Sequence, residues 1–182
     1  ISDDQQTMRI VPLAAGGSYT ASDRLTAGYA MVTWPVTSRI ELIGGARVEN
    51  SRVEVASLSS AGEPSLANPT FTDVLPSLSM NLKLNDRTNL RLSATQTLSR
   101  PEYRELSPVL FREVIGFDNV KGNENLTRAL VQNYDLRWEW YPGAGEVLSV
   151  AVFAKRFSDP IERVYRGSSG TRIITFVNAA GA

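Results

Sequence analysis

Residues 89–99 read NLRLSATQTLS and carry the clearest strand pattern in the chain. The apolar side chains of this stretch fall on even positions, at Leu90, Leu92, Ala94 and Leu98. Polar side chains occupy the odd positions between them. Because successive side chains of a β-strand point to opposite faces, this period of two predicts a strand with one apolar and one polar face.

The same alternation extends in both directions along the chain. It predicts further strands at residues 24–34, 39–56, 73–84, 131–141, 147–157 and 172–177, with a shorter candidate at 161–165. Residues 1–23 are expected to form a loop, and Glu102–Leu106 a single helical turn after Pro101. The Gly44-Gly45 pair inside a strand indicates a bulge or a close approach of two backbones.

The connections between these strands alternate between short and long. The short turns lie at 35–38, 85–88 and 142–146, and the long polar connections at 50–72, 100–130 and 158–171. In an antiparallel sheet this order places all the short turns at one end and all the long loops at the other. The pattern is typical of outer-membrane β-barrels. The predicted fold class is therefore all-β, with antiparallel up-and-down strands that form a segment of a transmembrane β-barrel.

A soluble antiparallel sheet also alternates apolar and polar residues, with one face on a core. Two features favour the membrane. The strands approach the roughly 9–11 residues that a tilted strand needs to cross the hydrocarbon. Aromatic side chains also lie beside the short turns, where a membrane–water interface would hold them. The predicted interface aromatics are Trp34, Trp138, Trp140 and Tyr141.

The composition excludes several classes of function. The 19 basic and 19 acidic residues balance, which argues against a nucleic-acid partner. The chain has no cysteine and no histidine, so a disulfide framework, a thiolate or histidine metal site and a histidine-dependent catalytic triad are not available to it. No metal site, no cofactor and no enzymatic activity are expected. The sequence also lacks an apolar run long enough for a transmembrane helix and shows no signal peptide at its start.

Four stretches together resemble a known family. Residues 98–106, LSRPEYREL, look like the "ARPxFxEL" stretch of TonB-dependent outer-membrane receptors. Residues 133–142, NYDLRWEWYP, and 152–162, VFAKRFSDPIE, resemble the strands that follow it in that family. Residues 73–78, DVLPSL, are similar to another recurrent stretch. The resemblance covers about residues 25–180, in the family's order.

The resemblance implies a barrel of about 22 strands closed by an amino-terminal plug domain. It implies a place in the outer membrane of a Gram-negative bacterium and transport energised by the TonB complex. Residues 1–182 are then expected to be part of the barrel domain, about seven strands, with the plug, signal peptide and terminal strand outside this chain. The expected partners are outer-membrane lipid, the plug, the remaining strands, TonB through parts outside this chain, and a small nutrient.

Two sets of candidate site residues follow. The polar face of the strands is expected to point into the barrel, toward the plug; its charged members are Glu41, Arg47, Glu49, Lys83, Arg91, Asp135, Arg137, Glu139 and Lys155. The long connection 100–130 is the candidate for ligand contact, because aromatic, amide and arginine side chains suit a sugar or an anionic chelate. Its candidates are Tyr103, Arg104, Phe111, Arg112, Phe117, Asp118, Asn119 and Asn123.

The leading hypothesis is an active-transport receptor that imports a scarce nutrient, either a carbohydrate or a metal chelate. A passive outer-membrane channel or adhesin and a soluble β-rich carbohydrate-binding module remain as alternatives. The alternatives differ in a testable property, because the isolated strands of a barrel have open edges that promote self-association. A soluble module would instead be a stable monomer.

Overall fold

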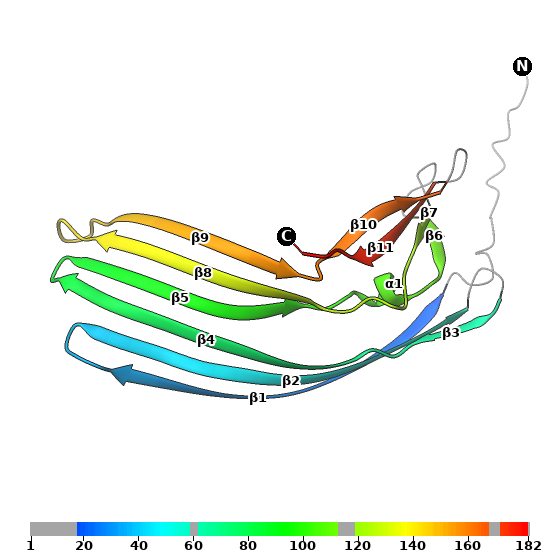
Figure 1. Ribbon diagram of the computed structural model, residues 1–182, viewed down its shortest axis with the longest axis horizontal. Coiled ribbons are helices and arrows are strands. Elements are labelled where there is room, and N and C mark those ends of the chain that lie inside the picture. Colours follow the sequence, from blue (N-terminus) through cyan, green and yellow to red (C-terminus); the bar gives the residue numbers. More distant parts are fainter. Residues whose placement is uncertain (1–17, 59–61, 113–118, 168–171, 182) are drawn as a thin grey trace, which may run out of the picture.

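The computed structural model describes residues 18–58, 62–112, 119–167 and 172–181. Its main feature is a curved antiparallel sheet of long strands (Figure 1). The strands follow the order β1-β2-β4-β5-β8-β9, and short β3 pairs with the outer part of β2. Their bounds are β1 Tyr19–Pro35, β2 Ile40–Leu58, β3 Pro64–Ala67, β4 Thr70–Asn85, β5 Thr88–Ser99, β8 Ala129–Trp140 and β9 Leu148–Ser158.

All three short turns lie at the same end of this sheet (Figure 1). Side chains close two of them. The Thr37 hydroxyl accepts hydrogen bonds from the backbone N–H of Arg39 and Ile40, and the Asn85 side chain accepts one from Arg87. This end is called the short-turn end, and the opposite end is called the loop end. The up-and-down antiparallel arrangement predicted from the sequence is confirmed.

A second, smaller sheet stands at the loop end, in the order β10-β11-β7-β6 (Figure 1). Its strands are β6 Leu110–Arg112, β7 Asn119–Lys121, β10 Ile161–Arg166 and β11 Ile173–Asn178. The predicted strand at 172–177 exists as β11, but it pairs with β10 and β7 and not with the wall. The short candidate strand at 161–165 is confirmed as β10, and the helical turn after Pro101 as α1, Tyr103–Leu106.

Sequence reasoning placed the beginning of β1 incorrectly. Residues 19–23 were expected in a loop, but Tyr19 pairs with Ser57 and the ladder runs without interruption to Pro35 and Glu41. The cause is tertiary: the long β2 offers backbone partners well beyond its apolar part. The wall strands are correspondingly long, with 17 residues in β1 and 19 in β2.

The register places the alternating side chains on two distinct faces. The predicted apolar positions of neighbouring strands are cross-strand partners, for example Leu42 with Met80 and Leu92 with Leu136. This side is called the outward face, and the other the inward face. A charge-free apolar band covers the outward face at residues 28–34, 40–48, 74–84, 90–94, 134–140 and 148–154.

Polar residues in register end the apolar band toward the loop end. Asn50 stands between Thr26 and Thr72, and its amide donates a 2.9 Å hydrogen bond to the Thr72 hydroxyl. On the same face of strands β5, β8 and β9, Gln132 pairs with Gln96 and with Arg156. On every long strand, a polar residue therefore marks where the band ends toward the loop end.

The buried apolar core lies at the loop end, on the inward face. Its buried members are Val53, Val55, Ala67, Leu106, Val120, Leu126 and Phe176. They come from the outer part of β2, from β3, from α1, and from the loops and the second sheet. In contrast, the middle of the wall is exposed on both faces, with Val150 on the outward face 57% exposed and Phe153 on the inward face 70% exposed. The described residues therefore leave the apolar side chains in the middle of the wall exposed on both faces.

At Gly45 the backbone of β2 lies close against that of β1. A Cβ atom on Gly45 would lie 2.4 Å from the Ala30 carbonyl oxygen. The ladders to β1 and β4 continue through this position in unbroken register. Of the two options that the glycine pair left open, the close backbone approach is therefore the one found. The helices of the described residues include none that is long and apolar enough to cross a membrane.

Candidate functional site on the inward face and at the loop end

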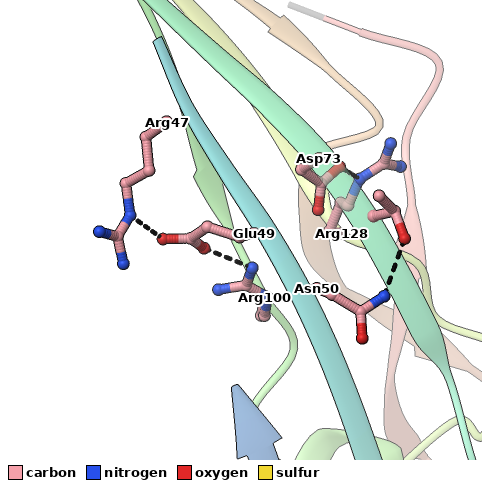
Figure 2. A network of polar contacts seen from close by, with 7 residues as sticks. Arg47, Glu49, Asn50, Asp73, Arg100 and Arg128 are labelled. Atoms are coloured by element: carbon pink, nitrogen blue, oxygen red, sulfur yellow. Dashed lines mark hydrogen bonds and ion pairs between the residues drawn. The ribbon is translucent and has the colours of Figure 1, made fainter. Parts of the chain in front are cut away.

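A buried carboxylate with two arginines marks the junction between the wall and the loops (Figure 2). Glu49 of β2 accepts a 2.5 Å hydrogen bond from Arg47 on one oxygen and a 2.6 Å hydrogen bond from Arg100 on the other. The Glu49 side chain is buried, and Arg100 lies directly after β5. Each oxygen of this carboxylate therefore accepts a hydrogen bond from a charged donor. Such bonds are stronger than those between neutral groups.

A second ion pair lies beside the first. Asp73 of β4 is the register partner of Glu49, and it accepts a hydrogen bond from Arg128 (Figure 2). Arg128 also lies over the ring of Phe71, 5.8 Å from its centroid. Glu49, Asp73, Arg47, Arg100 and Arg128 are together called the junction cluster.

The junction cluster fixes both ends of the long connection between β5 and β8. Arg100 is its first residue and Arg128 its last before β8. Asp73 and Arg100 each keep one buried polar atom, Oδ2 and Nε respectively, without a partner among the described residues. The cluster is thus tightly packed but not saturated with hydrogen bonds.

Another buried carboxylate organises the inward face near the short turns. Glu139 of β8 is 4% exposed and contacts Arg91 at 3.2 Å and Arg137 at 3.1 Å. The Tyr141 hydroxyl donates a third contact, 3.1 Å long, to the same carboxylate. These four residues are called the short-turn cluster.

The ligand candidates of the loop end divide into exposed and engaged side chains. The Tyr103 hydroxyl donates to Asp23 of β1 at 3.3 Å, and the negative charge of Asp23 raises the pKa of Tyr103. The Arg104 guanidinium stacks over Phe111, 4.5 Å from the ring centroid. Phe111 itself packs against the loop-end core. Tyr103 and Arg104 make these contacts and are both still exposed at the surface.

Asn123 forms hydrogen bonds only within the described part of this chain. Its amide donates to the Phe176 carbonyl at 2.9 Å, while its side-chain oxygen accepts from the Asn125 N–H at 3.0 Å. Its backbone N–H also binds the Glu105 carbonyl of α1 at 2.6 Å. These bonds favour a structural role, because both ends of the amide are already used.

The remaining ligand candidates lie around the second sheet. Asn119 is half-buried in β7, opposite Arg112 of β6. The predicted residues Phe117 and Asp118 lie outside the described residues. The structure therefore brings Arg104 and Phe111 into contact. It places Asn119 at the first position of β7, opposite Ile173, and Asn123 just after the other end of β7.

The predicted charged residues of the polar face occupy inward positions. Glu41 accepts a 3.0 Å hydrogen bond from Asn81, its register partner. Lys83 pairs in register with Asn89, which in turn pairs with Glu139. Asp135 and Lys155 lie farther from the short-turn end and are exposed.

The predicted interface aromatics all lie at the short-turn end. Trp34 pairs with Leu42, Trp138 with Val150 and Trp140 with Leu148, all on the outward face. Tyr141 differs, because its hydroxyl reaches Glu139 on the inward face. Their contact with a membrane interface stays a prediction.

Sequence reasoning missed Asp73, Arg100 and Arg128. Asp73 lies at an odd-numbered position of β4, as do the other inward residues of that strand, so the alternation pattern could have identified it. The arginines had no such signal, because each binds a carboxylate more than 50 residues away in sequence. Among the described residues, no group of three or more acidic side chains is placed to hold a metal ion.

A tall antiparallel wall with short turns at one end, an uncharged outward band and a charged inward face defines a segment of a β-barrel. The family comparison agrees: the model described as "TonB dependent receptor-like, beta-barrel" matches residues 2–182. The chain belongs to this family, which is made up of transport receptors. The comparison with curated proteins found no match.

Solved structures of the same architecture include three with different cargo. One is a double mutant of the Serratia marcescens hemophore receptor HasR in complex with its hemophore HasA and heme, with a TM-score of 0.68 and 12% identity over 86% of this chain. The second is the siderophore receptor PirA from Pseudomonas aeruginosa, with a TM-score of 0.60 and 15% identity over 90%. The third is the copper transporter OprC, with a TM-score of 0.62 and 19% identity over 87%.

This chain spans 29%, 38% and 25% of the length of those three structures, respectively. At such identities the likeness shows the fold alone.

Proposed function

We propose that this chain forms part of the wall and outer loops of an outer-membrane receptor that binds a scarce nutrient and imports it with energy from the TonB complex. The apolar band is the observation that carries the proposal. Its outward positions on six long strands are uncharged, and polar residues end it in register. A soluble sheet would need an equally large apolar partner, and the described residues contain none.

The dimensions of the band fit a bilayer. Residues 40–48 of β2 span about 30 Å along the strand at roughly 3.3 Å per residue. A tilt of about 40° reduces this to about 23 Å, close to the roughly 25 Å apolar band of outer-membrane barrels. The tryptophans at the short-turn end would then lie at one interface, with the indole N–H in the headgroup layer.

The loop end would meet the nutrient. It offers an arginine stacked on an aromatic ring, Arg104 on Phe111, and an exposed phenol at Tyr103. These groups suit an anionic metal chelate or a carbohydrate. Among proteins of this fold, the hemophore receptor HasR is solved with heme and PirA is a siderophore receptor.

The test is tryptophan fluorescence of the barrel protein that carries this chain, reconstituted in vesicles whose lipids bear bromine quenchers at known depths. Tryptophans elsewhere in that protein are replaced by phenylalanine. Trp34, Trp138 and Trp140 are expected to be quenched most strongly by bromines near the interface. Quenching that is absent at every depth would show that the band packs a soluble core.

The passive-channel alternative requires a second measurement. Uptake of ferric citrate and of a labelled oligosaccharide is compared in cells with and without a functional TonB complex. Uptake that depends on TonB supports the receptor, whereas equal uptake in both strains would favour a channel.

A further inference from the structure

We propose that the outward face carries a phosphate-binding site just beyond the apolar band, formed by Arg24 of β1 and Arg52 of β2, and that its occupant is the headgroup of a phosphate-bearing lipid. This inference rests on the proposed function, because it requires the outward face to lie against a bilayer. It adds a defined headgroup site, whereas the function alone requires only contact with apolar chains.

The two arginines face each other across the ladder between β1 and β2. Arg24 and Arg52 are register partners at even-numbered positions of the outward face, and both are exposed. On its other side Arg52 pairs with the neutral Thr70. Side chains directly opposite on neighbouring strands have Cβ atoms about 4.5–5.5 Å apart, and like charges in such a pair destabilise the sheet. An anion bound between the two guanidinium groups would remove this repulsion.

The nearby acidic side chains do not neutralise the pair. Asp23 lies on the inward face, where it accepts the Tyr103 hydroxyl. Glu54 shares the outward face but lies two positions farther from the band, and it forms no ion pair with either arginine. In the described parts of β1, β2 and β4, it is the only acidic residue of this face beyond the band. Two guanidinium groups therefore remain available to an anionic ligand.

The pair lies at the level of the lipid headgroups. Val48 is the last apolar outward residue of the band on β2, and Arg52 follows four positions later, about 13 Å along the strand at roughly 3.3 Å per residue. A tilt of about 40° places it about 10 Å above the hydrocarbon. Each headgroup layer is about 5–8 Å thick. Because the apolar stem of an arginine can lie along the protein surface, its guanidinium can reach down into that layer.

The surface below the arginines favours a lipid over free phosphate. Val48 and Val74 are register partners at the edge of the band, 46% and 54% exposed. The polar Asn50 and Thr72 lie between these valines and the level of the arginines. One lipid can place an acyl chain on the valines and its phosphate between the guanidinium groups, which bind phosphate through parallel hydrogen bonds. Free phosphate has only the second of these contacts.

The two ends of the wall also differ in charge. Beyond the band toward the loop end, the outward positions of the long strands carry three arginines and one acid: Arg24, Arg52, Arg156 and Glu54. The three short turns carry two residues of each sign: Arg39, Arg87, Asp86 and Glu146. A surplus of arginine at one end only supports an anionic headgroup in the leaflet at the loop end.

Native mass spectrometry of the full-length barrel protein in detergent tests the site. The probes are phosphatidic acid, whose headgroup is an open phosphate monoester, and phosphatidylcholine, whose phosphate carries a covalently attached cation. We expect phosphatidic acid to bind on the order of tenfold more tightly, since its phosphate can accept charge-assisted hydrogen bonds from both arginines.

The double variant R24Q/R52Q should remove this preference and leave binding of phosphatidylcholine unchanged. The matched control K155Q/R166Q removes the same number of positive charges, from the inward face and from the second sheet, and should keep the preference. The variant R24K/R52K retains both charges without the planar fork, so it should give an intermediate preference.

Photo-cross-linking locates the bound lipid in a bilayer. Thr26 lies two positions from Arg24 on the same face and is replaced by benzoylphenylalanine. The protein is reconstituted in phosphatidylcholine vesicles that contain a minor fraction of phosphatidic acid. Mass spectrometry should find phosphatidic acid among the lipid adducts in clear excess over its share of the vesicle, and this excess should be lost when Arg24 and Arg52 are also replaced by glutamine.

Several results would overturn the proposal: equal affinity for the two lipids, an unchanged preference in R24Q/R52Q, or a cross-link to a neighbouring protein segment in place of lipid. Displacement of phosphatidic acid by millimolar inorganic phosphate would assign the arginines to free phosphate instead. Should R24Q/R52Q fail to assemble, R24K/R52K decides, and a preference equal to that of the unmodified protein contradicts the site. Normal tryptophan quenching without lipid preference refutes this inference alone; absent quenching refutes the barrel itself.

Discussion

At the scale of single residues, buried carboxylates organise a wall that has little apolar core. Glu49 and Glu139 each collect two arginines on the inward face, one near the loops and one near the short turns. A buried ion that loses its partner is costly, because the remaining charge stays desolvated. These two positions should therefore be far less tolerant of neutral substitution than the exposed charges between them.

Glu49→Gln tests this difference. It leaves Arg100, which is only 20% exposed, without its anion. We expect a loss of about 2–3 kcal/mol in the free energy of unfolding, measured by denaturant titration of the reconstituted protein. The matched control is Glu41→Gln, where one hydrogen bond from Asn81 changes and the loss should stay below about 1 kcal/mol. Equal losses would contradict the role given to the junction cluster.

Gly45→Ala tests the close approach of β1 and β2. The new methyl group would overlap the Ala30 carbonyl oxygen, so the two strands must separate or shift. We expect a clear fall in the fraction of protein that assembles as a heat-modifiable barrel on electrophoresis. Gly28→Ala is the control, because a Cβ there has no atom within 4 Å. Normal assembly of Gly45→Ala would mean that the two backbones can separate at little cost.

At the scale of elements, the loops form a small folded unit with its own core. α1 carries a capping box in which Glu102 and Glu105 satisfy each other's backbone N–H groups. Leu106 at its end is fully buried. Gly122 lies against the carbonyls of Arg104 and Ser107 so closely that a Cβ would collide with both. The helix, the second sheet and the outer part of β2 therefore stabilise one another.

Leu106→Ala should loosen this unit and leave the wall intact. Removal of a buried leucine costs about 2–5 kcal/mol, and here the loss falls on the loop end. We expect faster hydrogen exchange in residues 100–112 and unchanged exchange in β4 and β5. The control Leu110→Ala alters a side chain that is already 37% exposed and should change little. Faster exchange throughout the wall strands would show that the two regions unfold as one.

The elements also show what sequence can and cannot predict. The wall strands were predictable because Leu90, Leu92 and Ala94 repeat at a period that only a strand satisfies. β6 and β7 have three residues each, too few to show a period. β11 was visible as a strand, but it pairs in parallel with Asn119–Lys121, and each pair of partners, such as Ile173 and Asn119, is 54 positions apart in the sequence. Arg100 and Arg128 were missed for the same reason, because each binds a carboxylate more than 50 residues away in the sequence.

At the scale of the whole molecule, the two faces of the wall differ in chemistry, because one is apolar and the other carries the charged residues. The outward apolar band includes large exposed side chains such as Val32, Leu78 and Val152, each more than half exposed. On a soluble protein a continuous apolar surface of this size would promote aggregation. Within the described ranges of the chain, β1 and β9 are the edge strands of the wall, and unpaired strand edges bind other strands.

Leu136→Arg and Gln132→Arg compare two depths on one strand and one face. Leu136 lies inside the band and Gln132 at its limit. Arginine near the bilayer midplane costs about 2–4 kcal/mol, and about 0–1 kcal/mol near the interface. Leu136→Arg should therefore destabilise the protein more than Gln132→Arg does, as measured by the free energy of unfolding in vesicles. Equal effects of both substitutions would argue against a bilayer around this band.

The length of β1 and β2 also sets how far the loop end projects. Both strands continue beyond the apolar band, β2 from Val48 to Leu58 and β1 from Gly28 back to Tyr19. With the band in the bilayer, about ten further residues at a tilt of about 40° raise their ends roughly 25 Å above the lipid. At that height a folded protein or an antibody can reach the second sheet on an intact cell without touching the membrane.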